Sequence, residues 1–141
     1  MGYYDKAKFV GDIHWMNIVH QIMYDVKVQD ILFNGKSIGL CKYPHNCTVT
    51  FDSGSTYMNV PTYAADLMQH HGIPVHSALP CNKSEQFGKI EFLIDGKKYE
   101  LENSDWMRDP EPVHAKTNGN QKNAPPAQEC KANILVVNVA E

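Results

Sequence analysis

The chain has 141 residues, 43% of them hydrophobic, which is enough for one domain with a buried core. Its formal net charge of −3 and pI near 6.1 argue against a nucleic-acid-binding protein, because no basic face is implied. No apolar run approaches the roughly 20 residues that a membrane-spanning helix needs.

Alternating apolar residues dominate the amino-terminal part. Residues 1–10 look like an irregular entry segment or a linker, and we place a single domain at residues 11–141. The period-two spacing of Ile13 and Trp15 predicts a strand that extends to Ile18. A second strand follows, with Tyr24, Val26 and Val28 on one face and the alternating polar residues on the other.

The turn residues mark two hairpins, and one helix is predicted between them. Asn34-Gly35 predicts a two-residue hairpin turn with a returning strand at residues 38–40. A helix is expected to open at residues 60–62 and to stop at residues 72–74 (Gly-Ile-Pro). Asp95-Gly96 predicts a second hairpin, between strands at residues 90–94 and 98–101.

The last part of the chain changes composition twice. Residues 109–129 are polar and rich in proline, which predicts a long exposed loop. Residues 134–137 (Ile-Leu-Val-Val) then predict a buried strand. The expected fold class is therefore all-β with one or two short helices.

The chemically informative stretch is Asp52-Ser53-Gly54-Ser55-Thr56, which follows a β-branched and apolar run at residues 48–51. Glycine lets the chain turn sharply and lets a backbone N–H approach the acid closely. The neighbouring hydroxyls can donate hydrogen bonds to the carboxylate and orient it. The same pattern is also typical of an ordinary β-turn, so it does not define a site by itself.

The flanking segments resemble the carboxy-terminal lobe of the pepsin-like aspartic proteases. Residues 11–15 are similar to the family's Gly-x-Leu-x-Trp strand, and residues 24–28 to its aromatic-x-Val-x-Val strand, in register with the Asn-Gly hairpin. The resemblance runs from Gly11 to Trp106 and resumes weakly at Cys130. The Asp-Ser-Gly-Ser-Thr variant and the short Cys41–Cys47 loop suggest a divergent eukaryotic member, similar to plasmepsins or cathepsin D.

Four cysteines can pair in three ways, and the resemblance implies Cys41 with Cys47 and Cys81 with Cys130. In the chain-entropy model the short loop contributes about 2 kcal/mol and the long loop about 4 kcal/mol. The alternative is a zinc site that draws on the histidines, but no pair of cysteines has a CxxC spacing. The resemblance implies no cofactor and no metal.

The resemblance also implies the chemistry. Aspartic proteolysis uses two carboxylates that share one proton across a water molecule. Asp52 would be the carboxylate of the second lobe, and Ser53 would bond to the opposite catalytic loop. Gly54 N–H would lie near the shared oxygens and Ser55 would bond the acid or the substrate backbone, while Thr56 would help shape the cleft wall.

Half of that machinery has no match in the sequence. There is no second Asp-Thr-Gly or Asp-Ser-Gly and no flap hairpin with its tyrosine. The hydrophobic-hydrophobic-Gly segment that threads behind the catalytic loop in the family has no match after Asn133, because residues 134–137 lack the glycine. We therefore expect one truncated lobe, inactive by itself, whose partners are the amino-terminal lobe and a peptide or protein substrate.

Two other readings stay open at this stage. One is a non-catalytic lobe kept as a binding or interaction domain, with the polar loop at residues 109–129 as its main support. The other is a homodimer in which two copies of Asp52 meet.

Disulfides imply an oxidising compartment, so the resemblance places the protein in the secretory pathway, a vacuole or lysosome, or outside the cell. Because the first residues lack the apolar core of a signal peptide, we expect the natural amino terminus to lie upstream.

Overall fold

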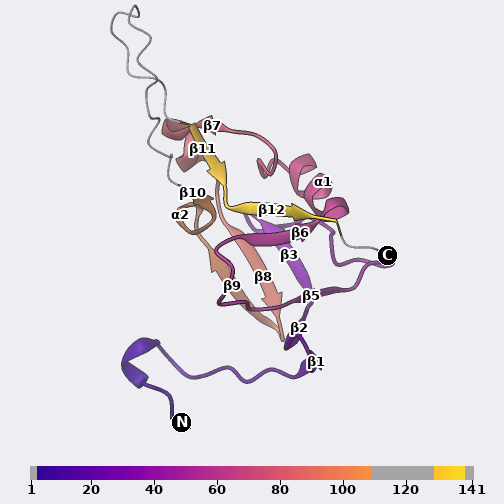
Figure 1. Ribbon diagram of the computed structural model, residues 1–141, viewed down its shortest axis with the longest axis vertical. Coiled ribbons are helices and arrows are strands. Elements are labelled where there is room, and N and C mark those ends of the chain that lie inside the picture. The colour runs from indigo at the N-terminus through magenta and orange to yellow at the C-terminus, as the bar shows by residue number, and fades with distance from the viewer. Residues whose placement is uncertain (1–2, 109–128, 139–141) are drawn as a thin grey trace, which may run out of the picture.

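The computed structural model describes residues 3–108 and 129–138 (Figure 1). These residues form short strands with two α-helices and two 3-10 helices, which confirms the all-β class with short helices. Most of the polar loop predicted at residues 109–129 lies outside the described residues, and Glu129 already belongs to a strand. No helix among the described residues is long and apolar enough to cross a membrane.

The largest sheet has four antiparallel strands in the order β4-β3-β8-β9. Its strands are β3 (Asp30–Phe33), β4 (Lys36–Ser37), β8 (Ile90–Ile94) and β9 (Lys97–Leu101). The predicted hairpins connect β3 with β4 and β8 with β9, although the returning strand of the first is Lys36–Ser37 and not residues 38–40, because the two-residue turn pairs Lys36 directly with Phe33. Both turns have positive φ at both central residues, Asn34 (51°) and Gly35 (75°) in one, Asp95 (49°) and Gly96 (72°) in the other, as a type I′ turn requires.

A second sheet has the order β1-β2-β5, with β1 (Ile18–His20), β2 (Asp25–Val28) and β5 (Cys47–Val49). Val26 and Val28 are buried as predicted, but two aromatic residues differ from expectation. Tyr24 is 69% exposed, because it lies in the turn after β1 with φ 55° rather than in β2. Trp15 is 80% exposed, because the segment before β1 forms no strand with any of the residues that the structure describes.

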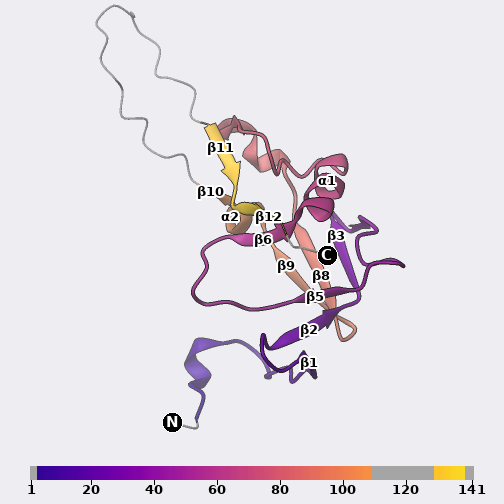
Figure 2. The same ribbon diagram turned by 45° about the vertical axis from the view of Figure 1, so that its right-hand side comes forward.

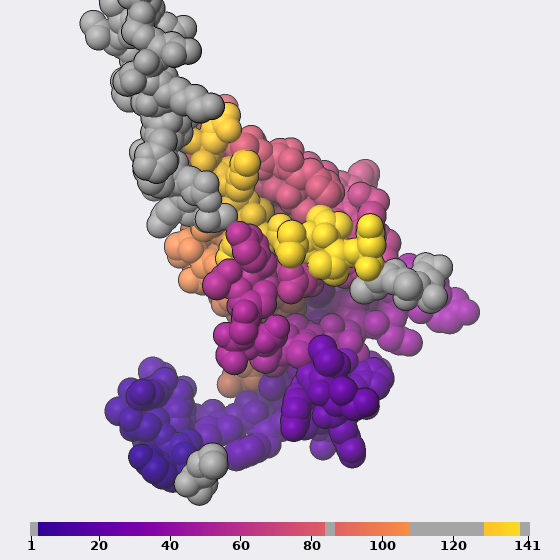
Figure 3. All heavy atoms as spheres, in the orientation of Figure 1, coloured from indigo at the N-terminus to yellow at the C-terminus, as the bar shows by residue number. Residues whose placement is uncertain are grey.

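The carboxy-terminal strands join parts of the chain that are distant in sequence. The strand β12 (Ile134–Val137) runs parallel to β6 (Met58–Pro61), with Ile134 opposite Met58 and Val137 opposite Pro61. Figure 3 shows the yellow end of the chain lying against the magenta segment. A third sheet has the order β10-β11-β7, formed by β7 (Leu79–Pro80), β10 (Met107–Arg108) and β11 (Glu129–Ala132).

The helices cover the core beside these strands. The predicted helix is α1 (Thr62–His70), which follows directly on β6, while α2 (Asn103–Trp106) is a single turn before β10. The 3-10 helices are η1 (Lys6–Lys8) and η2 (Cys81–Gln86). The main core brings together buried side chains of α1, α2, β6, β8, β12 and the segments that follow β4 and α1: Ile38, Leu40, Val60, Ala64, Ala65, Met68, Ile73, Ile90, Trp106 and Ile134. This core fixes the end of β6, and thereby the end of the loop that precedes it.

Candidate active-site loop

The Asp52 stretch lies in the connection between β5 and β6, an open loop that Figure 2 shows running away from the sheets. Asp52, Ser53 and Gly54 are exposed. The N–H of Gly54 donates to Oδ1 of Asp52 at 2.8 Å, and Ser55 N–H donates to the main-chain carbonyl of Asp52 at 3.2 Å. The loop therefore presents an exposed carboxylate that its own backbone orients.

Glycine at position 54 permits this close approach. A Cβ placed on Gly54 would lie 3.2 Å from Oδ1 of Asp52, which is tighter than an ordinary van der Waals contact. The approach of a backbone N–H to the acid has the form predicted from the strand–Asp–Ser–Gly pattern.

The hydroxyl of Ser55 forms its hydrogen bonds with residues 57 and 59 and not, as expected, with the acid. It donates to the carbonyl of Tyr57 at 3.0 Å and accepts from Tyr57 N–H at 3.2 Å and from Asn59 Nδ2 at 3.4 Å. Because these partners follow it in the chain, Ser55 stabilises the end of the loop. Its predicted contact with substrate backbone, and the roles of Ser53 and Thr56, stay predictions.

Three polar side chains outside the predicted set tie the loop to the body of the fold. At its start, Thr50 Oγ1 donates to Oδ1 of Asp25 on β2. At its end, the side-chain amide of Asn133 donates to the carbonyl of Thr56. Backbone bonds fix Asn133 in turn: its carbonyl accepts from Met58 N–H at 2.9 Å and its N–H donates to the carbonyl of Trp106 at 2.7 Å.

The strand that lacks the family's glycine nevertheless lies next to this region. β12 begins directly after Asn133 and pairs with β6, which begins directly after the loop. Absence of the glycine from residues 134–137 therefore does not prevent the carboxy-terminal strand from pairing with the segment that follows Asp52.

The acid on β2 that Thr50 contacts has a lowered pKa. The pKa of Asp25 lies below its ordinary value, first because Thr50 donates a hydrogen bond to it and then because His20 donates and adds attraction, against an opposing effect of burial. The His20 Nδ1 to Asp25 Oδ2 distance is 3.0 Å. Nothing in the sequence pattern singled out Asp25, which only alternation placed on the polar face of its strand.

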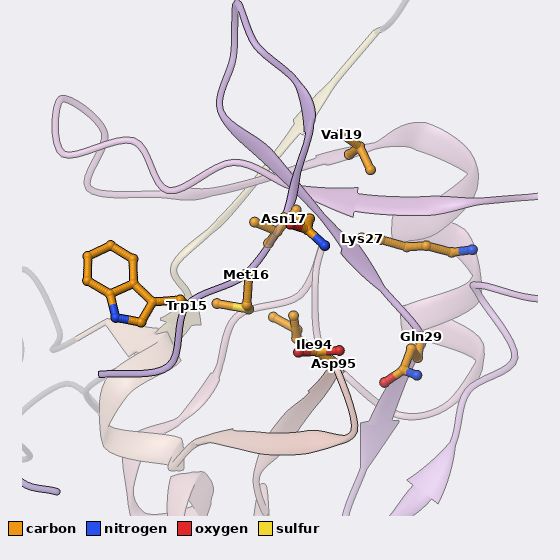
Figure 4. A pocket seen from close by; sticks show the side chains of 9 residues that line it. Trp15, Met16, Asn17, Val19, Lys27, Gln29, Ile94 and Asp95 are labelled. Carbon is orange, nitrogen blue, oxygen red and sulfur yellow. The ribbon is translucent and has the colours of Figure 1, made fainter. Parts of the chain in front are cut away.

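Two hollows adjoin the segment before β1, and both have Met16 in their lining. One, of about 320 Å³, is lined by apolar side chains that include Phe51, which directly precedes Asp52; its lining consists of Met16, Val49, Phe51, Met58, Phe92, Ile94, Tyr99 and Leu101. The other, of about 290 Å³, lies between the segment before β1 and the β8–β9 turn. Figure 4 shows Met16 beside Ile94 there. The predicted site residues line neither hollow.

Both disulfides implied by the resemblance are present. Cys41 is bonded to Cys47 in the turn that leads into β5, and Cys81 is bonded to Cys130 between η2 and β11. All four cysteine sulfurs are therefore engaged with one another, so they do not serve as the thiolate ligands of the alternative zinc site.

An all-β lobe with two disulfides and an exposed aspartate on a strand–Asp–Ser–Gly turn is typical of the pepsin-like aspartic proteases. The chain belongs to the eukaryotic aspartyl protease family, whose model matches residues 1–120.

The chain is also similar to individual proteins whose names fit this family. The chain is 22% identical over 112 residues to gastricsin from Oryctolagus cuniculus, and 22% identical over 108 residues to human gastricsin. It is 28% identical over 110 residues to a probable aspartic-type endopeptidase CTSD from Arthroderma otae. These matches cover 76%, 73% and 73% of this chain but only 28%, 27% and 27% of the relatives. The chain thus spans less than a third of their length.

Proposed function

We propose that this chain contributes one catalytic carboxylate, Asp52, to an aspartic-type endopeptidase that hydrolyses peptide bonds. The observation that supports this most directly is the exposed carboxylate of Asp52, oriented by Gly54 N–H at 2.8 Å on the loop of a member of the aspartyl protease family. An ordinary β-turn would account for the hydrogen bond, but not for the family membership or the two matching disulfides.

The chemistry requires a second acid. One carboxylate removes a proton from the attacking water while the other, protonated, polarises the peptide carbonyl. Two neighbouring carboxyl groups do not both ionise easily, so their titration belongs to the pair. Asp52 by itself cannot perform both roles, and we expect this chain alone to be inactive.

The proposed partner is the amino-terminal lobe of a pepsin-like protease, which would supply the other carboxylate and the flap. In the assembled site, Ser53 would bond the opposite catalytic loop and Gly54 N–H would lie near the shared oxygens. Ser55 and Thr56 would support the loop and the cleft wall. The two disulfides fit an oxidising compartment, and we propose the secretory pathway, a vacuole or lysosome, or the extracellular space.

Reconstitution tests this proposal. The purified chain is assayed with a quenched-fluorescence peptide library at acid pH, alone and after refolding with the amino-terminal lobe of a pepsin-like protease. We expect no cleavage by the chain alone, and cleavage by the mixture that Asp52→Asn lowers by about 10⁴-fold or more. The matched control is Asp66→Asn, which neutralises an exposed aspartate on α1.

Two outcomes would overturn the proposal. Acid-dependent cleavage by the chain alone, abolished by Asp52→Ala, would show that the chain completes the pair without a second lobe. Light scattering would then distinguish a homodimer, in which two Asp52 residues meet, from a monomer. Cleavage by the mixture that is unaffected by Asp52→Asn would remove Asp52 from the site.

The second candidate function is a non-catalytic lobe that acts as an interaction domain. It is favoured by large apolar side chains that stay exposed around β1 and the turn after it, namely Ile18, Val19, Ile22 and Met23. Stable binding of the amino-terminal lobe without any cleavage in the same experiment would support this candidate over the protease.

A further inference from the structure

The loop that carries Asp52 is not held by apolar packing at its start. Phe51, directly before the aspartate, is 70% exposed, and the strand β5 already ends at Val49. The backbone at positions 50 and 51 thus leaves the sheet before it reaches the acid. Some other interaction must fix the direction in which the loop departs.

The hydrogen bond from Thr50 to Asp25 is placed at that point. Asp25 begins β2, and its neighbour Val26 lies opposite Val49 in the β2–β5 pairing. The carboxylate of Asp25, one residue beyond this last paired position, reaches the first residue of the loop, Thr50, and its Oδ1 accepts from the hydroxyl. This side-chain hydrogen bond therefore connects β2 to the chain directly after the end of β5.

The acceptor is itself immobilised. Its second oxygen, Oδ2, accepts from His20 Nδ1 at 3.0 Å, and the Asp25 side chain is only 13% exposed. A carboxylate that uses both oxygens is fixed in rotation as well as in position. Hydrogen bonds to an ionised acceptor are stronger than those between neutral groups, and the lowered pKa of Asp25 favours the ionised form.

We propose that Asp25 is a positioning residue for the reaction: through Thr50, it sets the orientation of the loop on which Asp52 and Gly54 lie. This inference rests on the proposed function of Asp52. Asp25 acts only through Thr50, two residues before Asp52. Asn133, which bonds the carbonyl of Thr56, holds the other end.

The orientation of the loop can be measured without an activity assay, from the amide proton of Gly54. Because Gly54 N–H donates to Oδ1 of Asp52 at 2.8 Å, its amide proton should shift as the Asp52 carboxylate ionises. The titration is followed by NMR on the ¹⁵N-labelled full chain. We expect Asp52→Asn to abolish the Gly54 shift, which identifies its source.

The test substitution is Thr50→Val, which removes the hydroxyl and keeps the branched shape. We expect it to reduce the Gly54 titration shift by about half or more, because the loop loses its contact with the charged acceptor. Thr50→Ser should restore the wild-type shift. The matched control is Thr48→Val, the same change at an exposed position two residues earlier in β5, which should leave the shift unchanged.

A second variant, Asp25→Asn, keeps the shape of the acceptor and removes its charge, and should reduce the Gly54 shift less than Thr50→Val does. If either variant retains the wild-type amide signals of the core while its Gly54 titration is also unchanged, the proposal is overturned. The absence of a Gly54 titration in the wild-type chain would overturn it as well.

The catalytic role of Asp52 and the positioning role of Asp25 can be tested separately, because each fails with a different experimental result. In the reconstituted enzyme Thr50→Val should lower kcat by about 10- to 100-fold with little change in KM, because a misoriented acid affects the chemical step. If Asp52 is not catalytic, Asp52→Asn leaves cleavage intact while Gly54 still responds to Thr50→Val. If only the positioning role is wrong, Asp52→Asn abolishes cleavage while Thr50→Val leaves the Gly54 titration unchanged.

Discussion

The carboxylate of Glu91 accepts a hydrogen bond from the ammonium group of Lys98 across the β8–β9 hairpin, at 2.9 Å. The Glu91 side chain is 1% exposed, and its other oxygen accepts the backbone N–H of Gly35 in the β3–β4 turn. A single buried acid on β8 thus links the predicted β3–β4 turn to the neighbouring strand β9 across the four-stranded sheet. Burial makes this acid dependent on its partners, because an unpaired buried charge is costly.

Lys98→Met should therefore destabilise the chain. It leaves Glu91 buried with one donor fewer, which costs about 1–3 kcal/mol, and the 48% exposure of the Lys98 side chain places the effect toward the lower value. The free energy of unfolding is measured by urea denaturation. Lys36→Met, at an exposed position of β4, is the control and should have little effect. Equal urea midpoints for the two variants would contradict the prediction.

The same acid predicts how stability changes with pH. The pKa of Glu91 lies below its ordinary value, first because of the Lys98 hydrogen bond and then because of the Gly35 N–H, against the opposing effect of burial. A lowered folded-state pKa adds stability that is fully present above the unfolded value, about 4.3, and is lost as the pH falls through the lowered value. The stability advantage of wild type over Glu91→Gln should thus shrink on acidification, as urea midpoints from neutral to strongly acid pH would show. A difference that stays constant with pH would exclude this linkage.

Gly88 should tolerate no side chain while Asn34 occupies the turn. A Cβ at position 88 would lie 1.4 Å from Oδ1 of Asn34, the atom that accepts Lys89 N–H at 3.0 Å. We expect Gly88→Ala to cost about 1–3 kcal/mol, measured by thermal or urea unfolding. Removing the obstructing side chain in the double variant Gly88→Ala/Asn34→Gly should recover part of the loss. Strict additivity of the two substitutions would count against a direct steric conflict.

The two disulfides should contribute unequally. Cys81 and Cys130 are 49 residues apart, whereas Cys41 and Cys47 are 6 apart, and the loss of loop entropy in the unfolded chain grows with loop length. We expect Cys81→Ala/Cys130→Ala to cost about 4 kcal/mol and Cys41→Ala/Cys47→Ala about 2 kcal/mol. Urea unfolding of both double variants under non-reducing conditions measures the difference. A larger loss for the short loop would contradict this order and show that native-state contacts of the Cys41–Cys47 bridge outweigh chain entropy.

Local signals in the sequence predicted the elements whose geometry depends on neighbouring residues. Asn34-Gly35 and Asp95-Gly96 predicted their hairpins, because a type I′ turn needs residues that adopt positive φ. The boundaries of α1 followed from Pro61 before it and Gly72 after it. The family resemblance indicated both cysteine pairs and the position of the acid, since these occur at characteristic points along the chain.

Contacts between distant residues decided the rest. Alternation placed Trp15 and Tyr24 in strands, but in the structure Trp15 lies in an unpaired segment before β1 and Tyr24 in a turn with positive φ, and both are exposed. Which polar side chains hold the loop of Asp52 was equally beyond the pattern, because the acceptor Asp25 and the donor Asn133 approach the loop only once β2 pairs with β5 and β12 pairs with β6. A sequence records which residues can turn, pair or bond; the register of strands that are far apart in the chain determines which of them meet.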